Sequence, residues 1–243
     1  MDKMETKTTE NEKGQVQNVN ARHAWTIVET RGYRRMHSLL RDAQENALML
    51  AVTGDAGCDK SEAVRGYAAA NRNVYILLCS ECWGCRRFMR ELLRSVGVRG
   101  QGGTVADMAD GIVRALGRRE NPLVVLDEAD KLSERSLCLL VSLQNRLEGR
   151  AGIVLCATGY LEKRIRQGVR GNRKGYRELY SRIGSRFIPL QAVNGEDIAA
   201  VCTANGVSDP EVVEGIIDES GGDLRRVRRK IHAVRQNGVL NGF

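Results

Sequence analysis

The chain has 243 residues, with 38 lysines and arginines against 30 aspartates and glutamates, and seven scattered cysteines. This length suits one large domain, or a core domain with a small satellite. The odd cysteine count excludes a secreted disulfide framework. The sequence has neither a signal peptide nor an apolar run of the roughly 20 residues that cross a bilayer, so we expect a cytoplasmic protein with no membrane partner. The net charge of +8 favours a polyanionic partner.

The order of apolar and polar segments predicts three regions. Residues 1–21 are polar and are expected to form a flexible tail. Residues 22–193 predict an α/β core with a helical lead-in between Arg22 and Glu45. Its expected strands are Leu48–Gly54, Asn73–Cys79, Leu123–Asp130, Gly152–Gly159 and Arg186–Leu190. Its expected helices are Ser61–Ala70, Cys85–Val96, Val105–Leu116 and Ser133–Leu147. Such alternation predicts a parallel sheet covered on both faces.

After residue 193 the strand pattern stops, and residues 194–243 are expected to form a small α-helical lid. Its helices are Asp197–Asn205, Pro210–Ser220 and Asp223–Gln236. Asp209 precedes Pro210 and suits the capping position of the second helix.

The segment GDAGCDKS lies between the first strand and its helix and matches most of the pattern G-x-x-x-x-G-K-[ST]. Backbone N–H groups of such a loop, and the helix N-terminus behind it, surround phosphates. Lys60 is expected to neutralise the β- and γ-phosphate oxygens, and Ser61 to hold Mg²⁺ through its hydroxyl. The expected nucleotide-binding residues are Gly54, Asp55, Ala56, Gly57, Cys58, Asp59, Lys60, Ser61 and Glu62.

Asp59 stands where the pattern has glycine, which allows close backbone approach and an easy φ. A carboxylate turned towards the phosphates repels them, whereas one turned to solvent leaves the backbone cradle intact. Both nucleotide affinity and hydrolysis therefore depend on where Asp59 points.

A second phosphate motif ends the third strand, where four apolar residues precede Asp127 and Glu128. In α/β sheets the carboxyl ends of the strands form the ligand-binding edge, so Asp127 is expected beside the loop. There Asp127 would hold Mg²⁺ through its water shell, and Glu128 would act as general base on the attacking water. Together the two motifs predict binding of ATP with Mg²⁺.

With Walker A at Gly54–Ser61 and Walker B at Val124–Glu128, the sequence resembles an AAA+ ATPase over about residues 22–236. The resemblance implies a P-loop NTPase three-layer sandwich with a parallel sheet and a helical lid. It also implies that Thr158 is sensor 1.

The same resemblance implies two roles for arginines. Arg225 in GGDLRRV matches the sensor 2 position, with Arg226 as the neighbouring alternative. An arginine finger that reaches the γ-phosphate of the adjacent subunit is expected at Arg182 first and Arg186 second. Hydrolysis would then require a homo-oligomer.

Within AAA+, the compact length, the helical lead-in, the Asp-Glu-Ala-Asp sequence and the short lid resemble the transposition regulators of the MuB, TnsC, TniB and IstB type. Those proteins form ATP-dependent filaments or rings on duplex DNA, select the target site and stimulate a transposase. The resemblance therefore implies double-stranded DNA, further copies of the chain and a transposase as partners. MuB carries an additional N-terminal DNA-binding domain, so here DNA contact is expected from the core.

Two other functions remain open. The chain could be an AAA+ loader or chaperone for replication proteins, or a nucleotide-binding module whose hydrolysis Asp59 has attenuated. A signalling ATPase is a third class, although no effector or repeat domain accompanies the core.

Two segments are candidates for DNA contact. The stretch QGVRGNRKG (Gln167–Gly175) predicts a mobile basic loop that touches the phosphate backbone through Arg170, Arg173 and Lys174, the alternative being a solvated loop. Arg99 lies in the glycine-rich loop Val96–Thr104, whose counterpart in the resembling filaments lines the central channel. Thr104 opens a helix and could offer its N–H to a phosphate.

The spacing Cys79-x-x-Cys82-x-x-Cys85 suggests a metal site, but a structural zinc needs four ligands. No histidine or fourth cysteine has suitable spacing, so we expect packed or surface thiols.

Overall fold

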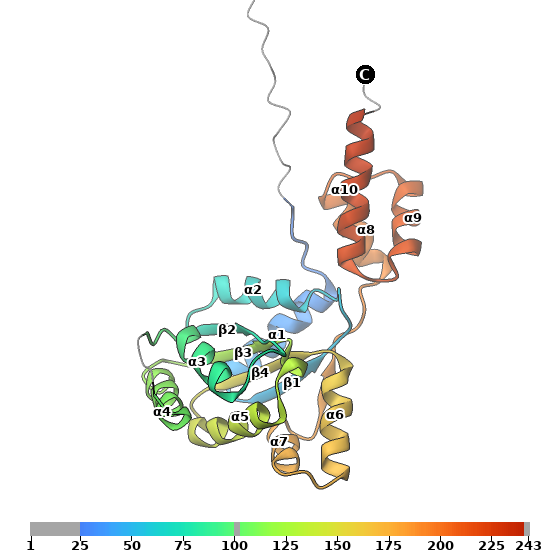
Figure 1. The fold of residues 1–243 in the computed structure, drawn as a ribbon. Helices are drawn as coiled ribbons and strands as arrows, with labels where there is room; N and C mark the ends of the chain where they lie inside the picture. The colour runs from blue at the N-terminus through green and yellow to red at the C-terminus, as the bar shows by residue number, and fades with distance from the viewer. Residues whose placement is uncertain (1–24, 100–102, 241–243) are drawn as a thin grey trace, which may run out of the picture.

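The structure, a computed structural model, describes residues 25–99 and 103–240, so the expected tail lies outside the described residues. Its centre is a five-stranded parallel sheet in the order β2-β3-β4-β1-β5 (Figure 1). The strands are β1 (Met49–Thr53), β2 (Val74–Leu78), β3 (Leu123–Asp127), β4 (Gly152–Ala157) and β5 (Phe187–Pro189). The central strands β3 and β4 are buried throughout, because helices cover both faces, and this explains their continuous apolar runs.

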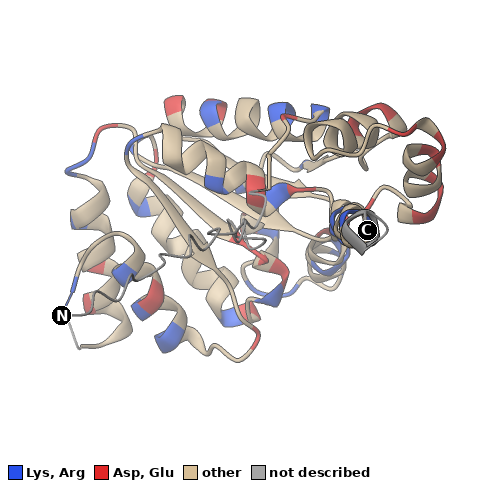
Figure 2. Ribbon diagram, turned by 90° about the horizontal axis from the view of Figure 1, so that it is seen from above, with Lys and Arg blue, Asp and Glu red and all other residues tan. Residues whose placement is uncertain are grey.

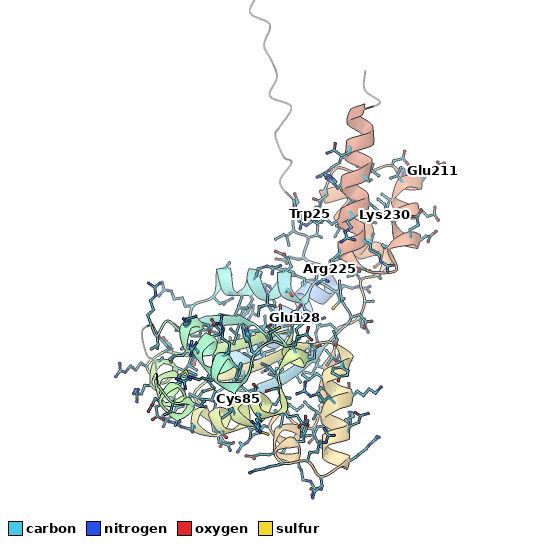
Figure 3. All side chains as sticks on the ribbon, in the orientation of Figure 1. Trp25, Cys85, Glu128, Glu211, Arg225 and Lys230 are labelled. Atoms are coloured by element: carbon cyan, nitrogen blue, oxygen red, sulfur yellow. The ribbon has the colours of Figure 1, made fainter. Side chains whose placement is uncertain are left out.

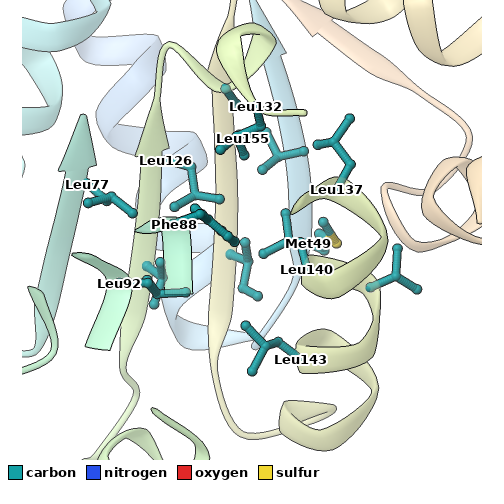
Figure 4. Close-up of a cluster of buried hydrophobic side chains, with 14 of the residues drawn as sticks. Met49, Leu77, Phe88, Leu92, Leu126, Leu132, Leu137, Leu140, Leu143 and Leu155 are labelled. Atoms are coloured by element: carbon teal, nitrogen blue, oxygen red, sulfur yellow. The ribbon is translucent and has the colours of Figure 1, made fainter. Parts of the chain in front are cut away.

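The helices form a layer on each side of the sheet. One face carries α1 (Arg31–Glu45) and α2 (Lys60–Ala70). The other carries α3 (Cys85–Ser95), α4 (Val105–Leu116), α5 (Glu134–Leu147), α6 (Gly159–Arg170) and α7 (Tyr176–Arg182). Successive residues of β3 point to opposite layers: Val125 packs with α1 and α2, whereas Leu126 packs with Phe88 of α3 (Figure 4). The predicted three-layer P-loop sandwich is confirmed.

The lid is a small helical unit with its own core, shown at the top of Figure 1. It consists of α8 (Gly195–Ala204), α9 (Pro210–Ser220) and α10 (Leu224–Leu240). Asp209 caps α9 as expected, since its Oδ1 accepts the N–H of Glu211 at 3.0 Å. The lid touches the phosphate loop directly, because the N–H of Leu224 donates to the carbonyl of Gly57 at 3.1 Å.

The third strand is shorter than expected. β3 ends at Asp127, Glu128 adopts a left-handed conformation with φ 56°, and a 3₁₀ turn, η1 (Ala129–Lys131), follows. The reason is Asp130, whose carboxylate accepts the N–H and the hydroxyl of Thr158, each at 3.3 Å. This contact turns the chain back towards the end of β4.

The expected mobile loop at Gln167–Gly175 is wrong in its first half, which belongs to α6. Gly168 is buried, and a Cβ there would lie 2.4 Å from the ring of Tyr176, so glycine allows α6 and α7 to pack closely. Gly171 caps the end of α6, and Gly175, with φ 81°, caps the start of α7. The glycines therefore build an ordered helix–turn–helix.

The lead-in contains one helix, α1, which begins after Thr30. The hydroxyl of Thr30 accepts the N–H of Tyr33 at 3.1 Å, and residues 25–30 before it are not helical. None of the helices in the described ranges is long and apolar enough to span a membrane.

Candidate nucleotide site

The two phosphate motifs meet at one edge of the sheet. The hydroxyl of Ser61 donates to Oδ2 of the buried Asp127 at 2.6 Å, joining the start of α2 to the end of β3. Both side chains offer the hard oxygen ligands that Mg²⁺ prefers, so this pair fits the predicted metal position. Asp127 Oδ1 also accepts the N–H of Glu128 at 3.0 Å, which fixes the carboxylate.

Lys60 lies inside the loop that it was predicted to serve. Its Nζ donates to the carbonyls of Gly54 at 2.6 Å and Asp55 at 2.9 Å, and lies 3.3 Å from Cys58 Sγ. The ammonium is therefore centred on the concave backbone where phosphate oxygens would replace these carbonyls as its partners.

Glu128, the predicted general base, forms an ion pair within its own turn. Its Oε2 lies 2.5 Å from Nζ of Lys131, and this hydrogen bond raises the pKa of the lysine. Thr158, the predicted sensor, directly follows β4 and donates to Asp130 of the same turn. The structure thus brings both residues to the edge that holds Ser61 and Asp127, as the parallel topology requires.

Asp59 is half-buried beside the phosphate loop, and its side chain makes no capping hydrogen bond. It stands at the N-cap position of α2 with φ 66° and lines a cavity of about 220 Å³ between the core and the lid. Burial raises the pKa of Asp59 to about 6, the nearby Glu62 adds to this rise, and Arg65 opposes it. The loop therefore carries a residue with a strained backbone and a poorly solvated carboxylate.

The cavity is also lined by residues that no sequence motif indicated for nucleotide binding. The segment 25–28 lines it on one side, and Arg228 of α10 places its guanidinium 4.9 Å from the ring centroid of Trp25. Arg225 lines it as well, whereas Arg226 turns to Asp223 at 4.0 Å, so the geometry favours Arg225 as the lid arginine. Figure 3 places Arg225 at the foot of the lid, between Trp25 and Glu128.

The two finger candidates differ in their surroundings. Arg182 donates to Glu148 at 2.7 Å and is half-buried. Arg186 is exposed and makes no ion pair with any residue that the structure describes. The sequence alone could not separate them, because both lie in one short segment.

The structure separates the expected DNA-contacting residues into two groups. Arg170, the last residue of α6, and Lys174 on the α6–α7 turn are both exposed. Lys174 lines a groove of about 680 Å³, where Arg173 pairs with Glu134 at 2.7 Å. Arg99 is exposed at the glycine-rich loop, of which residues 100–102 lie outside the described ranges.

Thr104, the expected phosphate donor, is the N-cap residue of α4. Its N–H donates to the carboxylate of Asp107 at 2.8 Å, while the hydroxyl accepts the N–H of Asp107. This capping box uses the donor within the chain and places a negative charge where the phosphate was expected.

Basic and acidic residues are also separated within the lid. Figure 2 shows Lys and Arg on α10 around the marked C-terminus, and Asp and Glu on the neighbouring lid helices.

All seven cysteines are free thiols, and the described residues contain no cluster of three or more metal-ligating side chains. Burial raises the pKa of Cys79 to about 12, with Asp127 adding to the rise, so this thiol is a poor nucleophile.

Comparison with known families and proteins gives consistent matches. The model of the AAA domain family matches residues 42–165, just over half of the chain. The ATP-dependent target DNA activator B of Escherichia phage D108 is 26% identical over 199 residues, which are 80% of this chain and 62% of that protein. The Mu-like prophage FluMu DNA transposition protein B of Haemophilus influenzae is 27% identical over 203 residues, 82% and 69% of the two chains. The chain thus spans about three fifths of the phage relative's length.

Solved structures share the fold at low sequence identity. The Walker-type ATPase of Pyrococcus abyssi has a TM-score of 0.58 and 14% identity, and the match covers 85% of this chain and 73% of that one. A DNA replication initiation factor has a TM-score of 0.57 and 17% identity, covering 88% and 63%. These likenesses support the arrangement of sheet, helices and lid.

Proposed function

Because the chain belongs to the AAA domain family and is distantly related to Mu transposition protein B, we propose that it is a cytoplasmic ATPase that assembles on duplex DNA. There it forms a filament or ring and regulates transposition by selecting target DNA and activating a transposase. The observation that carries the nucleotide part is the Ser61–Asp127 contact at 2.6 Å, with Lys60 and Glu128 on the same edge. The DNA part is supported by relatives named as target DNA activators.

ATP would lie between the core and the lid. Its phosphates would accept from the loop N–H groups and from Lys60, and its nucleoside would enter the cavity beside Trp25 and Arg225. Mg²⁺ held by Ser61 and Asp127 would neutralise charge on the phosphates during phosphoryl transfer. Glu128 would take the proton of the attacking water.

The site needs a second copy of the chain to be complete. We assign the finger to Arg186 in place of Arg182, because Arg182 already holds Glu148, whereas Arg186 is exposed and unpaired among the described residues. A positive charge supplied by a neighbour stabilises the transition state of phosphoryl transfer and makes hydrolysis depend on assembly. The bound γ-phosphate would then favour the subunit interface, and hydrolysis would release it.

Subunit mixing tests this assignment. R186A should lower the DNA-stimulated kcat by about 10²-fold or more while leaving ATP binding to the isolated chain unchanged. R182A, the matched control, should lower it far less. E128Q and R186A are each expected to be inactive alone but to regain activity when mixed, since one subunit supplies the base and its neighbour the arginine. No recovery on mixing would exclude an arginine supplied in trans.

DNA binding is tested by its salt dependence. Retention on random-sequence duplex should require ATP and fall steeply with salt, because backbone contacts release counterions. Replacing Arg170 and Lys174 together by alanine should weaken binding equally on all sequences and reduce the salt slope by about 2. Absence of ATP-dependent retention on random-sequence duplex would contradict this proposal and favour the loader.

Asp59 favours a second candidate, a nucleotide-binding module with attenuated hydrolysis. Its left-handed backbone strains the phosphate loop, and its ionised carboxylate is poorly solvated there. Both effects disfavour a loop that is ready to bind nucleotide. Restoring glycine separates the two candidates, because a large gain in turnover would show that Asp59 limits the wild-type enzyme.

A further inference from the structure

The turn that carries Glu128 is fastened to the neighbouring helix α6. The guanidinium of Arg164 donates to the carbonyl of Asp130 at 3.0 Å and to the carbonyl of Leu132 at 2.6 Å. Thr158, which caps α6, donates to the carboxylate of Asp130 at 3.3 Å. The main chain immediately after Glu128 therefore cannot move without breaking contacts to α6.

The same turn leads into α5, whose first residue is fastened to the basic α6–α7 turn. Oε1 of Glu134 accepts from Nη1 of Arg173 at 2.7 Å and from the hydroxyl of Tyr176 at 2.9 Å. These two hydrogen bonds lower the pKa of Glu134, so its charge is retained at neutral pH. The hydroxyl of Tyr176 also accepts from Nε of Arg164 at 3.4 Å. A continuous chain of contacts thus joins Arg173 to the turn of Glu128.

The two ends of this chain differ in exposure. Tyr176 is 3% exposed and packs on Gly168, so the inner end is shielded from solvent. The side chains of Arg173 and Glu134 are 64% and 52% exposed, and an exposed ion pair of this kind is weak and screened by salt. A phosphate is a strong partner for a guanidinium, so a polyanion on this surface can draw Arg173 away from Glu134.

We propose that Glu134 is a positioning residue that couples polyanion binding at Arg173 to the state of Glu128. This inference rests on the proposed function and adds its regulation. Without DNA, Arg173 and Tyr176 donate hydrogen bonds to Glu134 and keep the turn 128–134 in place. Lys131 Nζ then lies 2.5 Å from Oε2 of Glu128 and forms an ion pair with its carboxylate. When phosphate takes Arg173, the turn relaxes, Lys131 leaves, and Glu128 becomes free to accept a proton from water.

The matched pair E134Q and E162Q tests the coupling. Glu162 makes a similar ion pair with Arg166 at 2.8 Å on α6, but neither side chain hydrogen-bonds to the turn 128–134 within the described residues. E134Q should raise the DNA-free kcat about three- to fivefold, leave the KM for ATP unchanged and lower the stimulation by DNA by the same factor. E162Q should change neither. Equal behaviour of the two variants, or a loss of rate both with and without DNA in E134Q, would overturn the proposal.

A second readout does not depend on turnover. Amide hydrogen exchange across residues 128–134 should rise in the wild-type chain when duplex DNA is added, and should already be raised without DNA in E134Q. R173A should show the raised exchange but weaker DNA binding. If the wild type binds DNA and hydrolyses ATP while exchange at 128–134 ignores DNA, the coupling alone fails. If it does neither, the proposed function fails with it.

Discussion

Asp59 occupies a backbone conformation that glycine adopts at the lowest cost. With φ 66° its Cβ pays roughly 1 kcal/mol for the left-handed region. Burial raises its pKa from 3.8 to about 6, with Glu62 adding to the rise, because the charged form is poorly solvated beside another carboxylate. Since the folded-state pKa lies above the unfolded value, this electrostatic cost is absent below pH 4 and reaches its full size once the pH has risen past about 6.

We therefore expect D59G to stabilise the chain by about 1–3 kcal/mol at pH 8, and by less at pH 5, where only part of the electrostatic cost is present beside the backbone gain. ATP should bind more tightly for the same reason, again more so at pH 8. Urea unfolding and ATP titrations at both pH values measure the two effects. D55A is the control, because Asp55 is exposed and sits at a variable position of the loop. A gain that is independent of pH would contradict the electrostatic part.

At the scale of helices, glycine has different roles in α6 and α9. A Cβ at Gly168 would lie 2.4 Å from the Tyr176 ring, whereas a Cβ at Gly215 meets nothing within 4 Å. G168A should therefore destabilise the chain by about 1–3 kcal/mol through overpacking. G215A should stabilise it by roughly 0.5–1 kcal/mol, because alanine is the better helix former. Thermal unfolding of the two variants gives the comparison, and a stabilising G168A would show that α6 and α7 do not pack as described.

Gly168 illustrates why the sequence predicted the strands better than it predicted α6. Runs of apolar residues predicted the five strands, and apolar spacing predicted most helices, because the buried positions of these elements are occupied by apolar side chains. In α6 the core positions are Leu161, Ile165 and Gly168, and a glycine that contacts an aromatic ring looks like a flexible loop residue. The Ser61–Asp127 contact followed from two motifs and parallel topology. The Glu128–Lys131 pair depends on a tight turn, and such a turn has no repeating pattern of apolar residues from which it could be predicted.

At the scale of the whole molecule, several contacts join the lid to the core. Gly57 allows Asp223 to reach the phosphate loop, and Arg31 pairs with Asp197 of α8 at 3.4 Å. A further joint is Asn205, 1% exposed, which binds the segment that precedes α1. Its Oδ1 accepts the N–H of Thr26 and its Nδ2 donates to the carbonyl of Thr26, both at 3.0 Å. These joints fix the walls of the nucleotide cavity.

Asn205 gives the sharpest test of this arrangement. N205A removes the two contacts to Thr26 and a third to the carbonyl of Val201 at 2.9 Å, leaving partly buried groups without partners. We expect a loss of about 2–3 kcal/mol in the free energy of unfolding. ATP affinity should also fall, because Thr26 lines the cavity. N145A, an exposed site on α5, should stay within about 0.5 kcal/mol of wild type. If N205A unfolds like N145A in urea and binds ATP normally, the segment 25–28 does not hold the lid against the core.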